Sequence, residues 1–432
     1  MARSALDVST MDPTADSVKE VIRTEVCVAG AGPGGCAAAL ALAKHGVPTL
    51  LVDRATFPRD KVCGDALSGK VMRVLDRIAP ELVAPLRADA AQLPSWGVTF
   101  TAPNGKSLRV PFSREEGIGT APGAIMPRLR FDQLLFDHAV GTPGITVLQA
   151  THLNDFQRTE NGWRIHDSRR QLRIESRLVI AADGANSHFA RHVAGIKMDP
   201  RHHCAGVRAY YQGVTGLDPK GYIELIFLKE LLPGYLWIFP LPDGRANVGL
   251  GLRSDVVRKR RSDLKTLMLR LVNEHPRLRD RFANAHMEGS IQGLGLPLAS
   301  ERQPLSGADY LLVGDAGHLI DPFTGEGISH AMISGAHAGD VAAEHLRAIR
   351  SSQPAVALSE YDRRVWNRLG KELSISTYLQ RAAGWPWLFD LVVGRAARNP
   401  RLADVISSMF NDLDMRAQLK RPGFYLGLLF DR

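Results

Sequence analysis

The sequence has few cysteines. Only four occur among 432 residues, at Cys27, Cys36, Cys63 and Cys204. Their spacing forms neither a paired CxxC set nor a regular disulfide framework, so we expect no metal site and no disulfide-stapled fold. A reducing, cytoplasmic compartment is the expected setting for such a chain.

Long apolar runs are also missing. The stretch from Trp385 to Val393 is about half as long as a membrane-spanning helix requires. The first twenty residues are polar and lack the apolar core of a secretory signal, so we interpret them as a disordered tail. Any membrane contact is therefore expected to be peripheral, at the inner membrane face, through the basic surface and the apolar segments 385–393 and 424–430.

Acidic residues are too few to balance the basic ones, and the formal net charge is +9. A basic chain can contact nucleic acid, anionic lipid or an acidic substrate. No nucleic-acid-binding motif accompanies the charge, so we expect no nucleic-acid partner. The densest basic run, RKRR at 258–261, is more consistent with a solvated helix face than with a lipid-binding patch.

The order of the expected elements indicates an α/β fold, and the length indicates two or three domains. A buried strand at 24–30, a helix at 34–45 and a second strand at 48–53 form the βαβ unit that opens a Rossmann-like fold. Short strands over 94–119 and a strand-rich stretch over 204–251 indicate an inserted antiparallel-sheet domain. The chain beyond residue 359 is expected to be mostly helical.

We therefore expect a discontinuous nucleotide-binding domain made of residues 22–93, 125–195 and 289–352. The substrate domain would be inserted as residues 94–124 and 196–288. Residues 353–432 would form a helical C-terminal region.

A glycine-rich turn follows the first strand, where GAGPGG matches the pattern G-x-G-x-x-G. Such glycines permit the turn, let a pyrophosphate approach the backbone, and let helix and strand pack closely. An acid at the end of the second strand lies at about the spacing of a ribose-binding residue. The residues expected to bind the dinucleotide here are Gly30, Gly32, Gly34, Gly35 and Asp53. A glycine turn in an unrelated α/β domain is the alternative.

Two later segments favour FAD over NAD as the cofactor. LVIAADGANSHFAR ends a strand with Asp183 and Gly184, and LLVGDAGHLIDPFTGEGI ends another strand with Asp315. A carboxylate at a strand end can bind the ribityl chain of FAD, although Asp315 alone could also be a helix cap. Backbone amides at a helix start can bind the flavin ring, which here gives Gly325, Glu326 and Gly327.

These segments resemble the geranylgeranyl reductase family, within the larger class of FAD monooxygenase-like flavoproteins. The resemblance is carried by VCVAGAGPGG, KVCGD at 61–65, PRLRFDQLL from residue 127, ADGANS from residue 182, and GDAGHLIDPFTGEGISHAMISG from residue 314. It implies that Arg128 lies near the cofactor phosphates, Asp315 near the ribityl chain and the TGEG loop near the isoalloxazine. Further cofactor contacts are expected at Pro322 and Ile328, within the last of these segments, and at Arg54, directly after Asp53.

One strand points to the reductase branch of this class. The family carries Y-x-W-x-F-P followed by V-G-x-G, and residues 233–251 read PGYLWIFPLPDGRANVGLG. Strand periodicity places Tyr235, Trp237 and Phe239 on one face. The resemblance favours an aromatic wall beside the flavin, with Tyr235 and Trp237 catalytic, over a sheet packed on its own core. Cys63 is a candidate proton donor, with a small buried hydrophobe as the alternative.

Two positions depart from the family pattern. Asp65 follows Cys-Gly where the family often has a small residue. His318 stands where the reductases usually have a small residue and where aromatic hydroxylases have histidine.

The resemblance implies an FAD-dependent enzyme that reduces isoprenoid carbon–carbon double bonds of a prenyl lipid, prenyl quinone or prenyl diphosphate. The alternative is a flavin monooxygenase or halogenase with an aromatic substrate, although the W-x-W-x-I-P strand of halogenases is not evident. A non-enzymatic redox partner or sensor is a third hypothesis. Only one G-x-G-x-x-G opens a βαβ unit, so we expect no dedicated NAD(P)H domain, and NAD(P)H, ferredoxin or a quinol remain open as electron donor.

Overall fold

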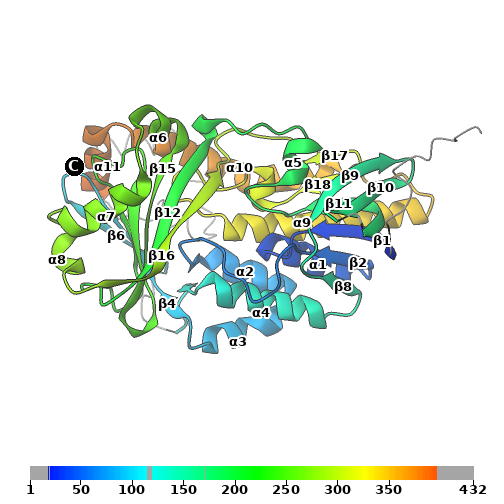
Figure 1. The fold of residues 1–432 in the computed structure, drawn as a ribbon, viewed down its shortest axis with the longest axis horizontal. Coiled ribbons are helices and arrows are strands. Elements are labelled where there is room, and N and C mark those ends of the chain that lie inside the picture. Colours follow the sequence, from blue (N-terminus) through cyan, green and yellow to red (C-terminus); the bar gives the residue numbers. More distant parts are fainter. Residues whose placement is uncertain (1–17, 19, 114–118, 170, 397–432) are drawn as a thin grey trace, which may run out of the picture.

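The structure is a computed structural model that describes residues 18, 20–113, 119–169 and 171–396. The described chain forms two halves, each built on a large sheet, with the long helix α9 running along one of them (Figure 1). The apolar segment predicted at 424–430 lies outside the described residues.

The first half is built on an eight-stranded sheet in the order β17-β18-β11-β1-β2-β8, with β10 and β9 added beside β11. Five central strands run parallel: β18 (Tyr310–Leu312), β11 (Leu172–Ala181), β1 (Glu20–Ala29), β2 (Thr49–Val52) and β8 (Ile145–Leu148). The antiparallel additions are β17 (Ser306–Gly307), β10 (Gly162–Asp167) and β9 (Leu153–Thr159). The last four residues of β1, 26–29, are buried, as expected for a parallel strand covered on both faces.

Helices α1 (Pro33–Lys44) and α9 (Ile328–Arg350) cross closely against this sheet. Small residues make the close approach possible. A Cβ at Gly335 would lie 2.1 Å from the carbonyl oxygen of Gly34, and one at Gly339 would lie 2.6 Å from that of Ala38. The alanine-rich sequence of α1 therefore reflects this tight crossing.

The second half is built on a seven-stranded sheet in the order β16-β12-β15-β14-β13-β5-β6. Neighbouring strands are antiparallel, except that β13 and β5 are parallel. The strands are β5 (Gly97–Thr101), β6 (Ser107–Pro111), β12 (His203–Gln212), β13 (Ile223–Ile226), β14 (Tyr235–Pro240), β15 (Arg245–Arg253) and β16 (His286–Pro297). Helix α7 (Leu264–Glu274) buries its apolar face against one side of this sheet.

Smaller elements complete the described fold. A three-stranded sheet contains β3 (Ala66–Leu67), β7 (Gly123–Ile125) and β4 (Leu93–Ser95). The remaining helices are α2 (Gly69–Ile78), α3 (Val83–Ala88), α4 (Arg128–Gly141), α5 (His188–His192), α6 (Ser254–Arg260), α8 (Arg279–Phe282), α10 (Ser359–Ala382) and α11 (Pro386–Ala396). Short 3-10 turns occur at Pro80–Leu82, Pro200–His202, Pro242–Gly244 and Gly314–Gly317.

The expected fold class is confirmed: a Rossmann-like α/β half carries an inserted, largely antiparallel sheet, and helices follow residue 359. Strand β16 stays within the second sheet through Pro297. We propose that the third part of the nucleotide-binding domain begins after this strand rather than at residue 289. Within the described residues, no helix is both long and apolar enough to cross a membrane.

Candidate cofactor and substrate site

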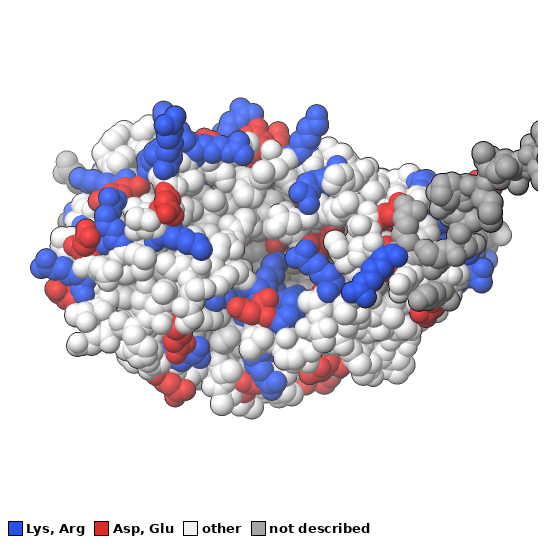
Figure 2. All heavy atoms as spheres, viewed as in Figure 1, with Lys and Arg blue, Asp and Glu red and all other residues white. Residues whose placement is uncertain are grey.

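A pocket of about 670 Å³ lies between the two halves and is lined by residues of all three sheets. The space-filling view shows the surface hollowed in this region, with charged side chains of both signs at the hollow (Figure 2). The pocket extends from the glycine turn before α1 to the aromatic residues of β14.

The glycines of the turn have different structural roles. A Cβ at Gly35 would lie 1.7 Å from the carbonyl oxygen of Gly30, and one at Gly30 would lie 2.3 Å from that of Ala182. These two glycines are therefore required by the packing of the turn itself. At Gly32 a Cβ would meet only the Arg59 guanidinium, at 3.5 Å, so Gly32 faces the open pocket.

The start of α1 is arranged to receive negative charge. Its N-cap, Gly32, provides no side-chain cap, and the first turn contains no acidic residue. Uncapped amides at a helix N-terminus attract anions. The buried carboxylate of Asp53 holds the turn in place, since its Oδ2 accepts a hydrogen bond of 2.8 Å from the amide of Ala31.

Two arginines line the pocket beside the helix start. Arg128 is buried and forms two 2.6 Å bonds to the Asp132 carboxylate one helical turn along α4. Arg59 donates to the same carboxylate at 2.6 Å. Burial alone would lower the pKa of Arg128, but Asp132 raises it above its usual range. Both guanidiniums are therefore fixed, charged donors at the wall of the pocket.

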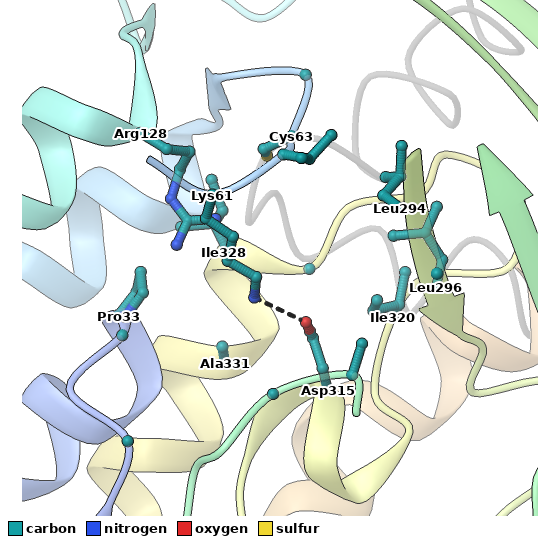
Figure 3. Close-up of a pocket in the computed structure, with 18 of the residues that line it drawn as sticks. Pro33, Lys61, Cys63, Arg128, Leu294, Leu296, Asp315, Ile320, Ile328 and Ala331 are labelled. Atoms are coloured by element: carbon teal, nitrogen blue, oxygen red, sulfur yellow. Dashed lines mark hydrogen bonds and ion pairs between the residues drawn. The ribbon is translucent and has the colours of Figure 1, made fainter. Parts of the chain in front are cut away.

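The strand ends supply two carboxylates. Asp183 accepts a 2.8 Å bond from the amide of His188 through Oδ2, whereas its buried Oδ1 has no hydrogen-bond partner among the described residues. Asp315 pairs with Lys61 at 3.0 Å (Figure 3). A buried acceptor without a partner is costly, so Asp183 Oδ1 is suited to a hydroxyl donor of a ligand.

A hydrogen bond from strand β14 holds the TGEG loop in place. The hydroxyl of Tyr235 donates to the carbonyl oxygen of Thr324, and a Cβ at Gly325 would lie 3.0 Å from that hydroxyl. Gly325 has a φ of +72°, a conformation that favours glycine. Helix α9 starts directly after this loop, and its N-cap, Gly327, has no side-chain cap.

The aromatic side chains of β14 form one wall of the pocket. Tyr235, Trp237 and Phe239 all line it, whereas Leu236 and Ile238 point into the core beneath α7. The paired strand β15 places Gly251 opposite Tyr235 and Gly249 opposite Trp237. A Cβ at Gly249 would lie 2.2 Å from the Trp237 ring, so the V-G-x-G pattern leaves room for the indole.

A buried polar network fixes this wall to the loop that carries Cys63. Asp65 is fully buried and accepts hydrogen bonds of 2.7 Å from both Tyr210 and Asn247. Asn247 also donates to the carbonyl oxygen of Cys63 at 2.7 Å and accepts from the Trp237 indole at 2.9 Å. Burial raises the pKa of Asp65 to about 6, although the bonds from Asn247 and Tyr210 lower it.

The structure brings most of the predicted site residues together. Those that line the pocket are Gly30, Gly32, Asp53, Arg54, Cys63, Arg128, Asp183, Gly184, Tyr235, Trp237, Asp315, Gly325, Glu326, Gly327 and Ile328. Three predicted residues are not among the described lining residues, namely Gly34, Gly35 and Pro322. A Cβ at Gly34 would lie 2.7 Å from the side chain of Val313, and the carbonyl of Pro322 accepts a 2.6 Å bond from Gln380.

Sequence reasoning missed several residues of the site. Arg59, Asp132 and Lys61 line or support the pocket through partners far away in the sequence. The network around Asp65 was visible only as a departure from the family pattern. His318, which favoured a hydroxylase, is half-buried but is not among the described residues that line the pocket.

The residues present fit FAD. The uncapped helix start and the two arginines suit a pyrophosphate, the orphaned oxygen of Asp183 suits a hydroxyl, and the start of α9 suits the polar edge of a flavin ring. The remaining lining is largely apolar and includes Leu294 and Leu296 of β16 (Figure 3). The pocket can therefore hold a charged cofactor at one end and an apolar chain at the other.

Comparison with protein families agrees with this geometry. Residues 23–213 match the family described as FAD binding domain, and residues 205–290 match the geranylgeranyl reductase catalytic domain. The two matches overlap along β12, a strand of the seven-stranded sheet.

Curated relatives align over most of the chain. Digeranylgeranylglycerophospholipid reductase of Methanosarcina acetivorans is 30% identical, covering 82% of this chain and 83% of the relative. Digeranylgeranylglycerophospholipid reductase of Methanocella arvoryzae is 31% identical, covering 81% of this chain and 84% of the relative. Menaquinone reductase of Mycobacterium tuberculosis is 28% identical over 94% and 97%.

Solved structures share the fold. A geranylgeranyl bacteriochlorophyll reductase-like protein from Thermoplasma acidophilum superposes with a TM-score of 0.74 at 23% identity, covering 92% of this chain and 98% of that one. The flavin-dependent brominase Bmp2 gives 0.72 at 19% identity, covering 90% and 93%. At these identities the likeness concerns the fold and does not separate reductase from halogenase.

Proposed function

Since this chain belongs to the geranylgeranyl reductase family of FAD-dependent oxidoreductases, we propose that it reduces isoprenoid carbon–carbon double bonds of a prenyl lipid, prenyl quinone or prenyl diphosphate. The observation that carries the proposal is the aromatic wall of Tyr235, Trp237 and Phe239 inside the pocket. The relatives named for a digeranylgeranyl lipid and for menaquinone support a prenyl chain as the group that reacts.

We assign the cofactor contacts from the pocket geometry. The start of α1 with Gly32, Arg59 and Arg128 would hold the pyrophosphate, and Asp53 and Arg54 would lie near the adenosine ribose. Hydroxyl groups of the sugar or ribityl chain would be bound by Asp183, Gly184 and Asp315. The Asp315 carboxylate would then contact both Lys61 and the cofactor. Gly325, Glu326, Gly327 and Ile328 would lie against the flavin ring. Pro322 is left out of this set because its carbonyl is bonded away from the pocket.

The protein's part in the reaction is to bind and orient the prenyl chain and to exclude water. When bound and reduced, FAD supplies the hydride. Trp237 is held in place by its hydrogen bond to Asn247, so its ring presents a fixed, electron-rich face that can stabilise developing positive charge on an alkene carbon. The Tyr235 hydroxyl is bonded to the TGEG loop, so this residue positions the loop as well as lining the pocket.

Cys63 lines the pocket on the loop held by Asp65 and Asn247. We retain it as a candidate group beside the reacting bond, where it would donate a proton or pack against the chain. The geometry of its loop is fixed by the network described above, which makes Asp65 a positioning residue.

The alternative, an aromatic hydroxylase or halogenase, finds less support in the pocket. It rested on the shared FAD architecture and on His318, and His318 is not among the described pocket-lining residues. No described feature of the apolar end selects an aromatic ring over a prenyl chain.

Peripheral contact with a membrane is part of the proposal. Four large apolar side chains are exposed near the junction of α10 and α11, at Tyr378 (69%), Trp385 (58%), Trp387 (67%) and Leu391 (40%). The opposite face of α11 packs into the apolar cluster that also contains Trp237 and Phe239, and the ring centroids of Phe389 and Phe227 lie 4.4 Å apart. Exposed tryptophan and tyrosine favour the membrane interface, so a lipid substrate would meet the protein on this side.

The electron donor is proposed to bind transiently, as NAD(P)H, a ferredoxin or a quinol. Anaerobic mixing of the oxidised protein with each donor, followed by its flavin absorbance, will identify which one reduces it.

Product analysis tests the proposed function. Purified protein is reduced anaerobically and incubated with a geranylgeranylated glycerophospholipid, with menaquinone, or with geranylgeranyl diphosphate. We expect at least one of the three to gain two hydrogen atoms per reduced bond by mass spectrometry. Unchanged substrates from FAD-replete, fully reduced protein would refute the proposal.

A further inference from the structure

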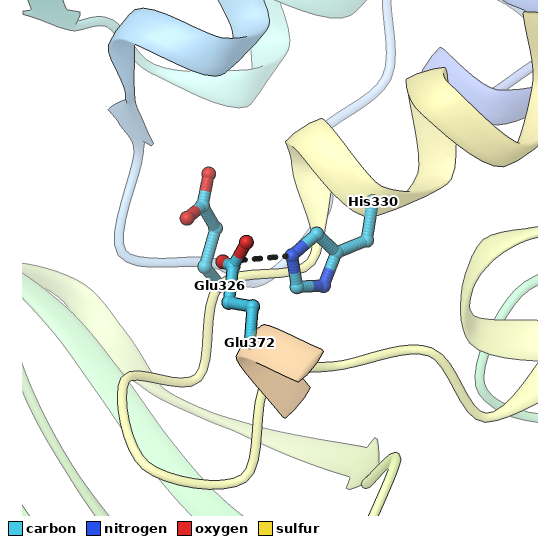
Figure 4. A group of neighbouring side chains, drawn as sticks. All are labelled: Glu326, His330 and Glu372. Atoms are coloured by element: carbon cyan, nitrogen blue, oxygen red, sulfur yellow. Dashed lines mark ion pairs between the residues drawn. The ribbon is translucent and has the colours of Figure 1, made fainter. Parts of the chain in front are cut away.

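A cluster of ionisable side chains lies directly behind the TGEG loop. Glu326 comes from the loop, His330 from the first turn of α9 and Glu372 from α10 (Figure 4). One nitrogen or oxygen atom of each lies within 4.8 Å of the others. Glu326 also lines the pocket, so the cluster reaches from the buried interior to the pocket itself.

Positive charge is already present in the cluster. The ammonium group of Lys70, whose side chain is 1% exposed, pairs with Glu372, and the hydroxyl of Ser68 donates to Glu326. A buried lysine at this position supplies the cation that two carboxylates require. The cluster is therefore better suited to holding protons than to binding a metal ion.

The histidine has one nitrogen committed and one available. His330 is fully buried, and its Nδ1 lies 2.8 Å from the carbonyl oxygen of Leu319, so Nδ1 carries a proton. Its Nε2 lies 3.6 Å from Glu372 and has no hydrogen-bond partner among the described residues. A buried, unpartnered ring nitrogen facing two carboxylates is in position to gain and lose a proton.

The charges facing His330 favour its protonated form. Burial lowers the pKa of His330, but Glu372 and Glu326 outweigh burial and raise it, with Lys70 acting against them. Burial would raise the pKa of Glu372, whereas Lys70 and His330 lower it to about 2. Asp321, also buried near the ring, has its pKa raised by burial. These shifts favour a protonated His330 imidazole and a negatively charged Glu372 carboxylate.

The proposed reaction needs such a proton. Reducing one double bond adds a hydride to one carbon and a proton to the other; the hydride brings the electron pair, the π electrons of the alkene form the bond to the proton, and the flavin is left oxidised. An isolated alkene is a weak base, so the acid must be strong, and a protonated carboxyl is stronger than an imidazolium by about two pKa values.

We propose that His330, held by Glu372 and Lys70, passes its proton to the Glu326 carboxylate, that Glu326 delivers this proton to the alkene, and that solvent entering the pocket after product release returns a proton to His330 through Glu326. The proposal rests on the proposed function. One ligand atom of Glu326 lies within 4.8 Å of a ring nitrogen of His330, so a small side-chain rotation or one bridging water would connect them. Glu326 would then be a catalytic residue, and His330, Glu372 and Lys70 would act through it.

The first test replaces Glu326 with glutamine, which keeps the size and an acceptor for Ser68 but cannot carry the proton. We expect FAD content and melting temperature close to wild type, and prenyl reduction slower by about 100-fold or more, as for loss of a general acid. Asp340→Asn is the matched control, because it removes a partly exposed, ion-paired carboxylate from the same helix α9, at a residue that does not line the pocket. That control should reduce the substrate at the wild-type rate.

Chemical rescue separates proton delivery from loop structure. Added formate should restore part of the rate of Glu326→Ala, and Glu326→Asp should keep more activity than Glu326→Gln. If Glu326→Gln retains FAD and reduces the substrate at the wild-type rate, or if formate restores nothing, Glu326 is not the donor.

A spectroscopic readout distinguishes this proposal from the function on which it rests. Labelled histidine can be titrated by NMR in the oxidised protein, with the His330 signal assigned by its loss in His330→Gln. We expect a His330 pKa above that of free histidine and a lower one in Glu326→Gln. If wild type reduces no prenyl substrate, the proposed function fails; if the His330 pKa is the same with and without Glu326, the relay fails independently.

Discussion

Replacement of Gly32 by valine separates cofactor binding from folding. Gly32 is the N-cap of α1 with φ −71° and ψ −179°, an extended conformation that any residue adopts. A Cβ there would meet only the flexible end of Arg59, at 3.5 Å. The substitution therefore introduces no clash within the protein, but it places a side chain where the pyrophosphate is proposed to approach.

The expected stability change of the cofactor-free protein is small. Losing a glycine N-cap costs up to about 1 kcal/mol, and restricting the unfolded chain returns roughly 0.4–1 kcal/mol. The net effect should lie within about 1 kcal/mol, which corresponds to a melting-temperature change of about 2–4 °C for a domain of this size. The bound fraction of FAD, by contrast, should fall to background.

Gly35→Ala is the informative contrast. Its Cβ would lie 1.7 Å from the backbone oxygen of Gly30, so the turn itself must move. We expect destabilisation of about 3 kcal/mol or more, as for severe overpacking, together with FAD loss.

Both variants and wild type are first stripped of FAD. Their melting temperatures are measured without and with added FAD, and FAD binding is measured separately by a fluorescence titration. Added FAD should raise the melting temperature of wild type but not that of Gly32→Val. Full FAD occupancy in Gly32→Val, or FAD loss accompanied by the same instability as Gly35→Ala, would refute the assignment of Gly32 to the pyrophosphate.

Further predictions concern the carboxylates and the aromatic wall. Asp315→Ala should weaken FAD binding by about 1.5–3 kcal/mol in equilibrium dialysis without changing the melting temperature of the cofactor-free protein; unchanged affinity with a lower melting temperature would indicate a purely structural role. Gly249→Ala should lower the free energy of unfolding by roughly 1–3 kcal/mol or more in thermal melts, because its Cβ would lie 2.2 Å from the Trp237 ring and 2.4 Å from a backbone oxygen. Gly251→Ala should lower it less, because the nearest atom to its Cβ is a cysteine sulfur at 3.2 Å. The pKa of Asp65 in the folded state, about 6, lies above its usual 3.8, so the folded state binds this proton more tightly than the unfolded state does. The free energy of unfolding from denaturant melts should therefore fall by about 3 kcal/mol as pH rises from about 4 to about 6. Asp65→Asn should not show this change. Trp237→Leu should lower prenyl turnover far more than it lowers the melting temperature; a stable, FAD-replete variant with normal turnover would remove the aromatic wall from the active site.

Local patterns in the sequence predicted much of the fold. The βαβ unit and the alternating face of β14 both follow from short-range periodicity and glycine placement. Because strand periodicity fixes which side chains share a face, the pocket position of Tyr235 and Trp237 could be predicted without the structure.

Long-range polar contacts could not be predicted in this way. The carboxylate of Asp132 joins Arg59 to Arg128, and Lys61 reaches Asp315 from 254 residues away. No local pattern encodes such partners, since only the folded topology brings them together. Asp65 shows the same limit, because its partners lie on β12 and β15.

Pro322, predicted from its motif as a cofactor contact, has a packing partner in the structure. Pro322 lies inside the matching segment, but its carbonyl is bonded to Gln380 of α10 and it is not among the described pocket-lining residues. A family motif marks a segment that must keep its shape, and some of its residues serve the packing of the loop rather than the ligand. The packing roles of Gly34 and Gly35 have the same explanation.

The most direct test of the central claim is the reoxidation of the reduced flavoprotein in a stopped-flow instrument. Protein reduced anaerobically is mixed either with a geranylgeranylated lipid in detergent or with oxygenated buffer, and the return of the oxidised flavin absorbance is followed. The account predicts rapid reoxidation by the prenyl lipid, with a saturated product, and slower reoxidation by oxygen. Rapid reoxidation by oxygen with no response to any prenyl substrate would contradict it and would favour an oxygen-dependent enzyme.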